Sequence, residues 1–178
     1  IGIASSVLIA QCLGARWPSV ALTVLTRTLK LSTLLAVIIV TVLFFGRSFF
    51  VSLYTQDPGV LAMAASLLIF GCMYHVFDAM QCVSSFALRS YRVTRVPMII
   101  YGVMLWAVGL GGGYLLAFGC ESFGGPYEAY GFWGATAAGL TLTGISLACM
   151  AIWVARQFAR DDGHTSEEIA EAIRVSQS

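Results

Sequence analysis

Long apolar segments, separated by short polar connections, make up most of the chain. Two stretches, Val96–Cys120 and Ala129–Ala155, contain no Asp, Glu, Lys or Arg, and each exceeds the roughly 20 residues that a helix needs to cross a bilayer. In lipid such a segment must be a helix, because an open strand would leave backbone N–H and C=O groups without partners. The pattern predicts an all-α, polytopic transmembrane helix bundle of about five helices, with apolar segments at Ile1–Ala15, Leu29–Tyr54, Val60–Leu88, Val96–Phe118 and Gly131–Val154.

Turn signals mark the connections between these segments. Trp17-Pro18 follows the first, Gln56–Gly59 separates the second from the third, Pro97 opens the fourth, and Gly124–Pro126 precedes the fifth. The first segment is short, since Ile1–Leu13 rises only about 20 Å as a helix against about 30 Å of hydrocarbon. No basic region of the kind that opens a signal peptide precedes it. We therefore expect the chain to be truncated at its start, and an amino-terminal part of the same chain to complete it.

Composition excludes a soluble globule and a nucleic-acid-binding protein. Of the 178 residues, 58 % are hydrophobic and 11 % are charged, whereas a soluble domain carries about 25 % charged residues. The ten Lys and Arg are scattered, with a net charge of +1, and cannot build the basic patch that nucleic acid requires. The five cysteines include no C-x-x-C pair, so neither a disulfide framework nor a zinc site is expected. Only Cys120 lies in a predicted loop.

Charge also predicts the orientation in the membrane. Basic residues occupy the first and third connections and the end of the last segment, whereas Glu121 and Glu128 occupy the fourth connection. By the positive-inside rule, the basic connections and the C-terminus face the cytoplasm and the amino end lies outside. Arg47, near the outer end of the second segment, is an exception that can snorkel to the headgroups. The basic residues concerned are Arg16, Arg27, Arg89, Arg92, Arg95, Arg156 and Arg160.

After Arg160 the chain is no longer apolar and becomes rich in polar and charged residues. We assign residues 1–160 to the transmembrane helices and residues 161–178 to a cytoplasmic tail. Thr165 and Glu168 have the spacing of a capping box, and apolar residues follow at helical intervals. This pattern predicts a short amphipathic helix over Thr165–Val175, with a solvated tail as the alternative.

Asp78 is an acidic residue deep inside an apolar segment. Nineteen uncharged residues, Gly59–Phe77, precede it, and ten more separate it from Arg89. An ionised carboxylate at such depth costs several kcal/mol, so it must be paired, bound to a cation or protonated. By default, such a residue marks an ion or substrate pathway. A structural hydrogen bond is the alternative interpretation.

Polar side chains extend the face of Asp78 over about three helical turns. Their oxygen and imidazole groups can bind a sodium ion or exchange a proton, which is transporter chemistry. We predict that Asp78 binds the cation, sodium being the one metal considered, and that Tyr74, His75, Gln81 and Ser85 line the pathway. As alternatives, His75 hydrogen-bonds Asp78 or faces the headgroups, and Tyr74 and Gln81 form interhelical hydrogen bonds. The face comprises Tyr74, His75, Asp78, Gln81, Cys82 and Ser85.

Small and aromatic residues gather in the last two segments. The Gly109-x-x-x-Gly113 spacing allows close approach between helices, and packing is the interpretation we prefer to a gating hinge. Most of the aromatic residues fit belts at the membrane interfaces. Tyr101 and Trp106 lie deep enough in their segment to be considered as substrate contacts.

Catalytic constellations are missing from the sequence. An intramembrane aspartyl protease needs two buried carboxylates that share a proton, and the apolar segments hold only Asp78. His75 and Asp78 lie on one predicted helix without a nucleophile motif nearby, and no phosphate-binding loop is present. We therefore expect no enzyme activity and no cofactor other than sodium or protons as coupling ions.

Two stretches together resemble one transporter family. FDAMQCVSSFALRSYRVTRVPM, Phe77–Met98, resembles the tenth helix and the following cytoplasmic loop of the multidrug and toxic compound extrusion (MATE) transporters. IASSVLIAQCLGAR, Ile3–Arg16, resembles the end of their eighth helix. The resemblance extends to about Arg160 and implies helices eight to twelve, the carboxy-terminal lobe, of a twelve-helix transporter.

The resemblance also implies a function and a site. In the branch that resembles the bacterial sodium-coupled members, the Asp of the D-A-x-Q pattern contributes to a cation site, and here that residue is Asp78. Its partner carboxylates come from helix seven, which precedes this chain. The implied protein is a secondary active antiporter in the bacterial inner (plasma) membrane that exports small organic cations or drugs in exchange for sodium ions or protons.

The chain departs from the family in one loop. Members commonly have L-R-G-x-G-D-T-R where this chain has Leu88–Arg95, so both glycines and the aspartate are replaced. This leaves the geometry of that turn open. Two other functions also remain open: a lipid-linked oligosaccharide flippase of the same superfamily, which needs a more cationic cavity, and a membrane scaffold that transports nothing.

Overall fold

The computed structural model describes residues 1–119 and 127–176, without the side chains of residues 128 and 162–176. Every regular element in this part of the chain is a helix, and four of the helices are long and apolar enough to cross a membrane. The predicted all-α transmembrane bundle is confirmed. Its elements are α1 (Gly2–Gly14), α2 (Pro18–Ser52), α3 (Pro58–Ser90), α4 (Arg95–Gly102), η1 (Val103–Gly111), α5 (Gly112–Phe118) and α6 (Glu128–Ser176).

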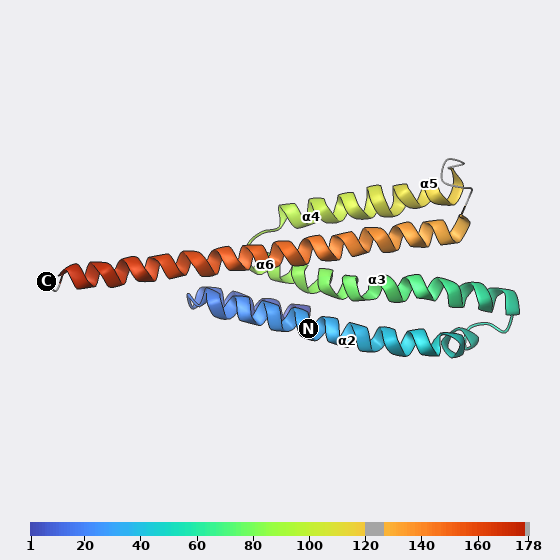
Figure 1. Cartoon of the computed structure of the whole chain (residues 1–178), viewed down its shortest axis with the longest axis horizontal. Helices are drawn as coiled ribbons and strands as arrows, with labels where there is room; N and C mark the ends of the chain where they lie inside the picture. Colours follow the sequence, from blue (N-terminus) through green and yellow to red (C-terminus); the bar gives the residue numbers. More distant parts are fainter. Residues whose placement is uncertain (120–126, 177–178) are drawn as a thin grey trace.

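The helices form an up-and-down bundle in which α4, η1 and α5 follow one another as a single rod beside α6 (Figure 1). Successive helices run in opposite directions. The α1–α2 and α3–α4 connections therefore lie at one end of the bundle, toward the C-terminus, and the α2–α3 connection lies at the other (Figure 1). The two basic connections thus share an end, as the charge pattern predicts. Which side of the membrane that end faces stays a prediction.

The second helix begins earlier than predicted. Hydropathy placed its start at Leu29, whereas α2 starts at Pro18, a residue suited to the first helical position because it has no N–H to leave unpaired. Arg27 and Lys30 lower the hydropathy of this turn, but both side chains are exposed. The opposite face is buried at the four-residue spacing of a helix, through Ala21, Leu25 and Leu29.

The last helix is longer than predicted at both ends. It was expected over Gly131–Val154, and α6 instead runs from Glu128 to Ser176 without interruption. The tail is therefore helical, but it extends α6, and Thr165 does not begin a separate helix. The predictions for Cys120, Glu121 and Gly124–Pro126 lie outside the described residues.

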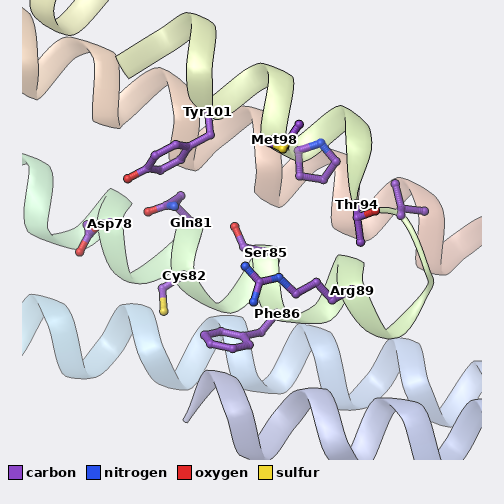
Figure 2. A pocket seen from close by; sticks show the side chains of 11 residues that line it. Asp78, Gln81, Cys82, Ser85, Phe86, Arg89, Thr94, Met98 and Tyr101 are labelled. Carbon is purple, nitrogen blue, oxygen red and sulfur yellow. The ribbon is translucent and has the colours of Figure 1, made fainter. Parts of the chain in front are cut away.

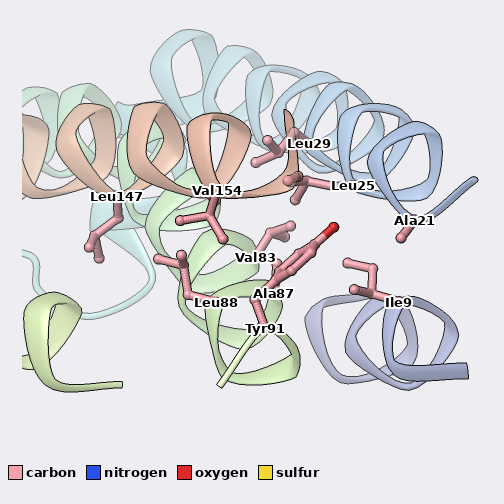
Figure 3. Close-up of a cluster of buried hydrophobic side chains, with 12 residues drawn as sticks. Ile9, Ala21, Leu25, Leu29, Val83, Ala87, Leu88, Tyr91, Leu147 and Val154 are labelled. Carbon is pink, nitrogen blue, oxygen red and sulfur yellow. The ribbon is translucent and has the colours of Figure 1, made fainter. Parts of the chain in front are cut away.

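A core cluster of buried side chains joins α1, α2, α3 and α6 near the end that carries the basic connections (Figure 3). Leu88 of α3 and Leu147 of α6 are completely buried in it. Farther along the same interface, Gly144 of α6 lies so close to the Phe77 carbonyl that an added Cβ would overlap it. The core cluster comprises Ile9, Ala21, Leu25, Leu29, Val83, Ala87, Leu88, Tyr91, Leu147, Ala151, Val154 and Ala155.

A π-helical stretch, η1, interrupts the rod beside α6. The Gly112 amide donates to the Ala107 carbonyl five residues earlier, which is the π pattern. Gly139 of α6 packs directly against this stretch, and a Cβ on it would lie 2.9 Å from the Met104 carbonyl oxygen. Gly109 and Gly113 are buried, which fits the packing interpretation of the glycine spacing.

The departure from the family loop has a visible backbone consequence. Arg92 stands at the second glycine of the loop pattern that the resemblance implies, and its φ is 60°. The turn is nevertheless closed, because the Val93 amide donates to the Leu88 carbonyl at 2.9 Å. This is the bonding of a helix that ends on a left-handed residue. An arginine therefore adopts the conformation that glycine takes at less cost.

Candidate cation and substrate site

A cavity of about 540 Å³ lies between the carboxyl-terminal half of α3 and α4 (Figure 2). We call it the Asp78 cavity. Asp78 and Tyr101 lie toward one end of it, and Arg89 and Thr94 lie toward the other (Figure 2). Its lining combines polar and apolar side chains: Asp78, Gln81, Cys82, Ser85, Phe86, Arg89, Val93, Thr94, Pro97, Met98 and Tyr101.

Asp78 is half-buried, and among the described residues no hydrogen bond or ion pair engages its carboxylate. It is therefore neither turned out of the bundle nor fixed to an arginine. Gln81 and Ser85, one and two turns along α3, line the same cavity. The structure thus brings together three of the predicted site residues, each with an oxygen that can face a hard cation.

These oxygens do not amount to a complete metal site within the described residues. No group of three or more His, Cys, Asp or Glu side chains gathers anywhere in that part of the chain. Asp78 is the one carboxylate that lines the Asp78 cavity. Further ligands would have to come from water, from backbone carbonyls or from other parts of the protein.

Tyr74 and His75 lie outside the Asp78 cavity. Tyr74 lines a second cavity of about 520 Å³ between α2, α3 and α6, where its ring stacks on Trp133 with centroids 6.5 Å apart. Tyr74 lies one turn nearer the start of α3 than Asp78, at the level of Trp133 of α6. His75 is half-buried, and no hydrogen bond joins it to Asp78 among the described side chains.

Comparison with known proteins decides the family. The family model described as MatE matches residues 1–115 of the chain. The chain belongs to the MatE family. The resemblance of Ile3–Arg16 and Phe77–Met98 to the multidrug and toxic compound extrusion family is thereby confirmed.

Relatives of this MatE chain are bacterial proteins named for multidrug resistance. A probable multidrug resistance protein NorM of Neisseria meningitidis serogroup B is 42 % identical over 147 residues, which are 83 % of this chain and 31 % of the relative. A probable NorM of Aromatoleum aromaticum is 37 % identical over 82 % of this chain and 31 % of its own length. PmpM of Pseudomonas aeruginosa is 37 % identical over 70 % of this chain and 26 % of its own length.

This MatE chain spans less than a third of the length of these relatives. Together with its long apolar helices, the relationship makes it part of a multi-pass membrane protein.

The four described cysteines, Cys12, Cys72, Cys82 and Cys149, are free thiols.

Sequence reasoning missed part of the lining of the Asp78 cavity. Arg89 was interpreted only as a loop charge, yet it lines the cavity and its guanidinium lies 5.3 Å from the centre of the Phe86 ring. The signal was present, because Arg89 follows Ser85 by four residues and Cys82 by seven, which continues the same helical face. Phe86, Thr94 and Met98 gave no comparable signal.

The two aromatic candidates for substrate contact have different positions. Tyr101 of α4 lines the Asp78 cavity opposite the polar face of α3 (Figure 2). Trp106, in η1, is 69 % exposed and belongs to neither cavity. Its position fits the exterior of the bundle, where an indole contacts lipid.

Proposed function

We propose that the whole protein is a secondary active antiporter that exports organic cations or drugs in exchange for sodium ions or protons. In this proposal Asp78 binds the coupling ion, and the protein lies in the bacterial plasma membrane with its basic connections and C-terminus in the cytoplasm. One observation carries the proposal. The Asp78 carboxylate lies on α3, a helix long and apolar enough to cross the membrane, and lines a cavity of about 540 Å³. No described residue forms a hydrogen bond or ion pair with it.

The lining of the Asp78 cavity supports both halves of such an exchange. On the α3 side, Asp78, Gln81 and Ser85 line the cavity with oxygens of the kind that bind a small cation. Met98 and Tyr101 offer an apolar and aromatic wall to an organic molecule on the other. A carboxylate that holds a cation in one conformation and releases it in another couples the two fluxes, because each ligand shifts the population toward the conformation that it binds better.

Replacement of Asp78 tests the proposal directly. Asp78→Asn in the whole protein keeps the shape of the side chain but removes its charge and its titration. We expect coupled export of a fluorescent organic cation from vesicles to be abolished, with membrane insertion unchanged. Asp57→Ser is the matched control, because it also removes a carboxylate but keeps an oxygen to cap α3, where Asp57 accepts from Gly59 N at 2.8 Å. Unchanged export by Asp78→Asn would remove Asp78 from the mechanism.

Imposing one ion gradient at a time distinguishes sodium from protons as the coupling ion. Export driven by a sodium gradient at equal pH identifies sodium as the coupling ion. Export driven by a pH gradient without sodium identifies protons. Export that follows neither gradient would contradict a secondary antiporter.

Thiol labelling distinguishes a transporter from a scaffold. Cys82 is exposed and lines the Asp78 cavity, whereas Cys149 of α6 is also exposed but does not line it. We expect the coupling ion or the organic cation to slow labelling of Cys82 and to leave Cys149 unchanged. Equal protection of both cysteines, or of neither, would argue against ligand binding in this cavity.

A further inference from the structure

Two arginines at one end of the bundle have an unusual backbone conformation. Arg16 and Arg92, each with φ of 60°, are the non-glycine residues with positive φ in the described part of the chain. L-residues pay a steric cost there that glycine does not. Both end a helix in the same way: the Trp17 amide donates to the Cys12 carbonyl at 2.8 Å, and the Val93 amide donates to the Leu88 carbonyl at 2.9 Å.

The hydrogen bond that closes each turn offsets part of this cost, but no described side chain binds either arginine. Both arginine side chains are exposed, and neither guanidinium forms a hydrogen bond or ion pair with another described residue. The acidic residues whose side chains are described are Asp57, Asp78 and Asp161, and none of them pairs with Arg16 or Arg92. Asp57 belongs to the connection at the opposite end of the bundle, and Asp78 lies within α3 (Figure 1). An anion that binds either guanidinium therefore lies outside the described side chains.

The location of the two arginines identifies the kind of partner. Both lie in connections at the same end of the bundle (Figure 1), and exposed apolar side chains begin within a few residues of each. Trp17, next to Arg16, is 63 % exposed, and Ile99, shortly after Arg92, is 59 % exposed. Exposed Trp beside Arg, at the point where an apolar exterior begins, is the composition of a membrane–water interface. The anions concentrated there are lipid phosphates.

We propose that Arg16 and Arg92 bind the phosphate headgroups of anionic lipids at this end of the bundle. A guanidinium donates two parallel N–H bonds to a phosphate and carries a charge that does not titrate. Arg89 and Arg95 flank Arg92 and strengthen the attraction of this surface for a negative leaflet. The two turns therefore present two headgroup-binding arginines at the same end of the bundle.

The proposal predicts that one pair of glycine substitutions raises the Tm in detergent but lowers the stabilisation by anionic lipid. In the whole protein purified in neutral detergent, Arg16→Gly with Arg92→Gly relieves the strain, so we expect the Tm to rise by about 1–2 °C. Added phosphatidylglycerol raises the Tm of the unsubstituted protein, and we expect the glycine pair to lose more than half of that rise. Phosphatidylcholine at equal concentration tests a headgroup whose phosphate is neutralised by its own ammonium, and inorganic phosphate tests a free anion.

Three further variants keep the test decisive. Arg16→Lys with Arg92→Lys keeps the charge and the strain, and should keep most of the phosphatidylglycerol response. Arg16→Asn with Arg92→Asn tolerates the left-handed backbone and should behave as the glycine pair does. Arg47→Gln, in α2 near the opposite end, should leave the response unchanged. A full phosphatidylglycerol response in the glycine and asparagine pairs, or an equal response to inorganic phosphate, would overturn the proposal.

Discussion

Between Asp78 and Tyr91, α3 presents one face to the core cluster and another to the Asp78 cavity. On the first face, Val83, Ala87 and Leu88 are buried against α1, α2 and α6. On the second, Asp78, Gln81 and Ser85 are half-buried and form no hydrogen bond with described residues. We call the first the dry face and the second the cavity face, and they have different roles within one helix. Because packing on the dry face fixes the position of α3, polar groups on the cavity face can exchange partners without unfolding the helix.

The largest expected effect comes from the dry face. Leu88 is completely buried, so Leu88→Ala leaves a cavity among close-packed side chains and should lower the free energy of unfolding by about 2–5 kcal/mol. Met98→Ala is the matched control on the cavity side, because it removes a side chain of similar size that is largely exposed. Thermal unfolding of the whole protein measures both. Similar losses for the two variants would show that the two faces are equally packed.

A second prediction concerns the contact that positions Asp78. Gly144 packs against the Phe77 carbonyl, one residue before Asp78. Gly144→Ala forces α6 away from this turn of α3, and we expect a loss of about 1–3 kcal/mol in stability together with reduced transport. Gly134→Ala makes the same change on the same helix where the nearest atom is 3.6 Å from the added Cβ. It should be close to neutral, since alanine also favours the helix. Equal effects of both variants would refute a specific contact at Phe77.

The helices were easier to predict than the way in which they pack against one another, and the reason is physical. Segment hydropathy located the helices because burial in lipid acts on whole segments, and Asp78 stood out because a charge is costly there. Hydropathy failed at Pro18, because the exposed basic side chains of Arg27 and Lys30 lie on one face of a helical turn whose opposite face is buried. The pairing of Tyr74 with Trp133, and the presence of Tyr101 in the Asp78 cavity, depend on how separate helices align along their axes. A single sequence does not encode that alignment in any local pattern.

Tyr91 offers a smaller test, because it places one polar atom on the dry face. Its hydroxyl is buried without a hydrogen-bond partner in the described structure, and its ring packs edge-on against Phe158. Tyr91→Phe removes a desolvated hydroxyl and keeps the ring, so we expect a stability gain of up to about 1 kcal/mol. A loss of stability would reveal a hydrogen bond to a group outside the described residues.

The same residue gives the dry face a predicted pH dependence. Burial, with a smaller contribution from the nearby Cys12 thiol, raises the pKa of Tyr91 from 10.0 to about 12. The folded state then holds the proton more tightly than the unfolded state does. The stability linked to Tyr91 is therefore complete below pH 10 and is lost as the pH rises toward 12. Alkaline unfolding curves should show a shallower loss between pH 10 and 12 for Tyr91→Phe than for the unsubstituted protein. Identical slopes would contradict the assignment.

The smallest effect gives the finest comparison, since adjacent serines lie on the two faces of α3. Ser84 is completely buried and its hydroxyl donates to the Met80 carbonyl at 2.7 Å, whereas Ser85 is half-buried and lines the Asp78 cavity. Ser84→Ala should change stability by less than about 1 kcal/mol, because the Met80 carbonyl keeps its helical hydrogen bond, and should leave transport unchanged. Ser85→Ala should leave stability unchanged and weaken the apparent affinity for the coupling ion. Unfolding and ion-dependent transport, measured on both variants, separate packing from binding between neighbouring positions. A loss of ion affinity in Ser84→Ala together with a loss of stability in Ser85→Ala would contradict the assignment of the two faces.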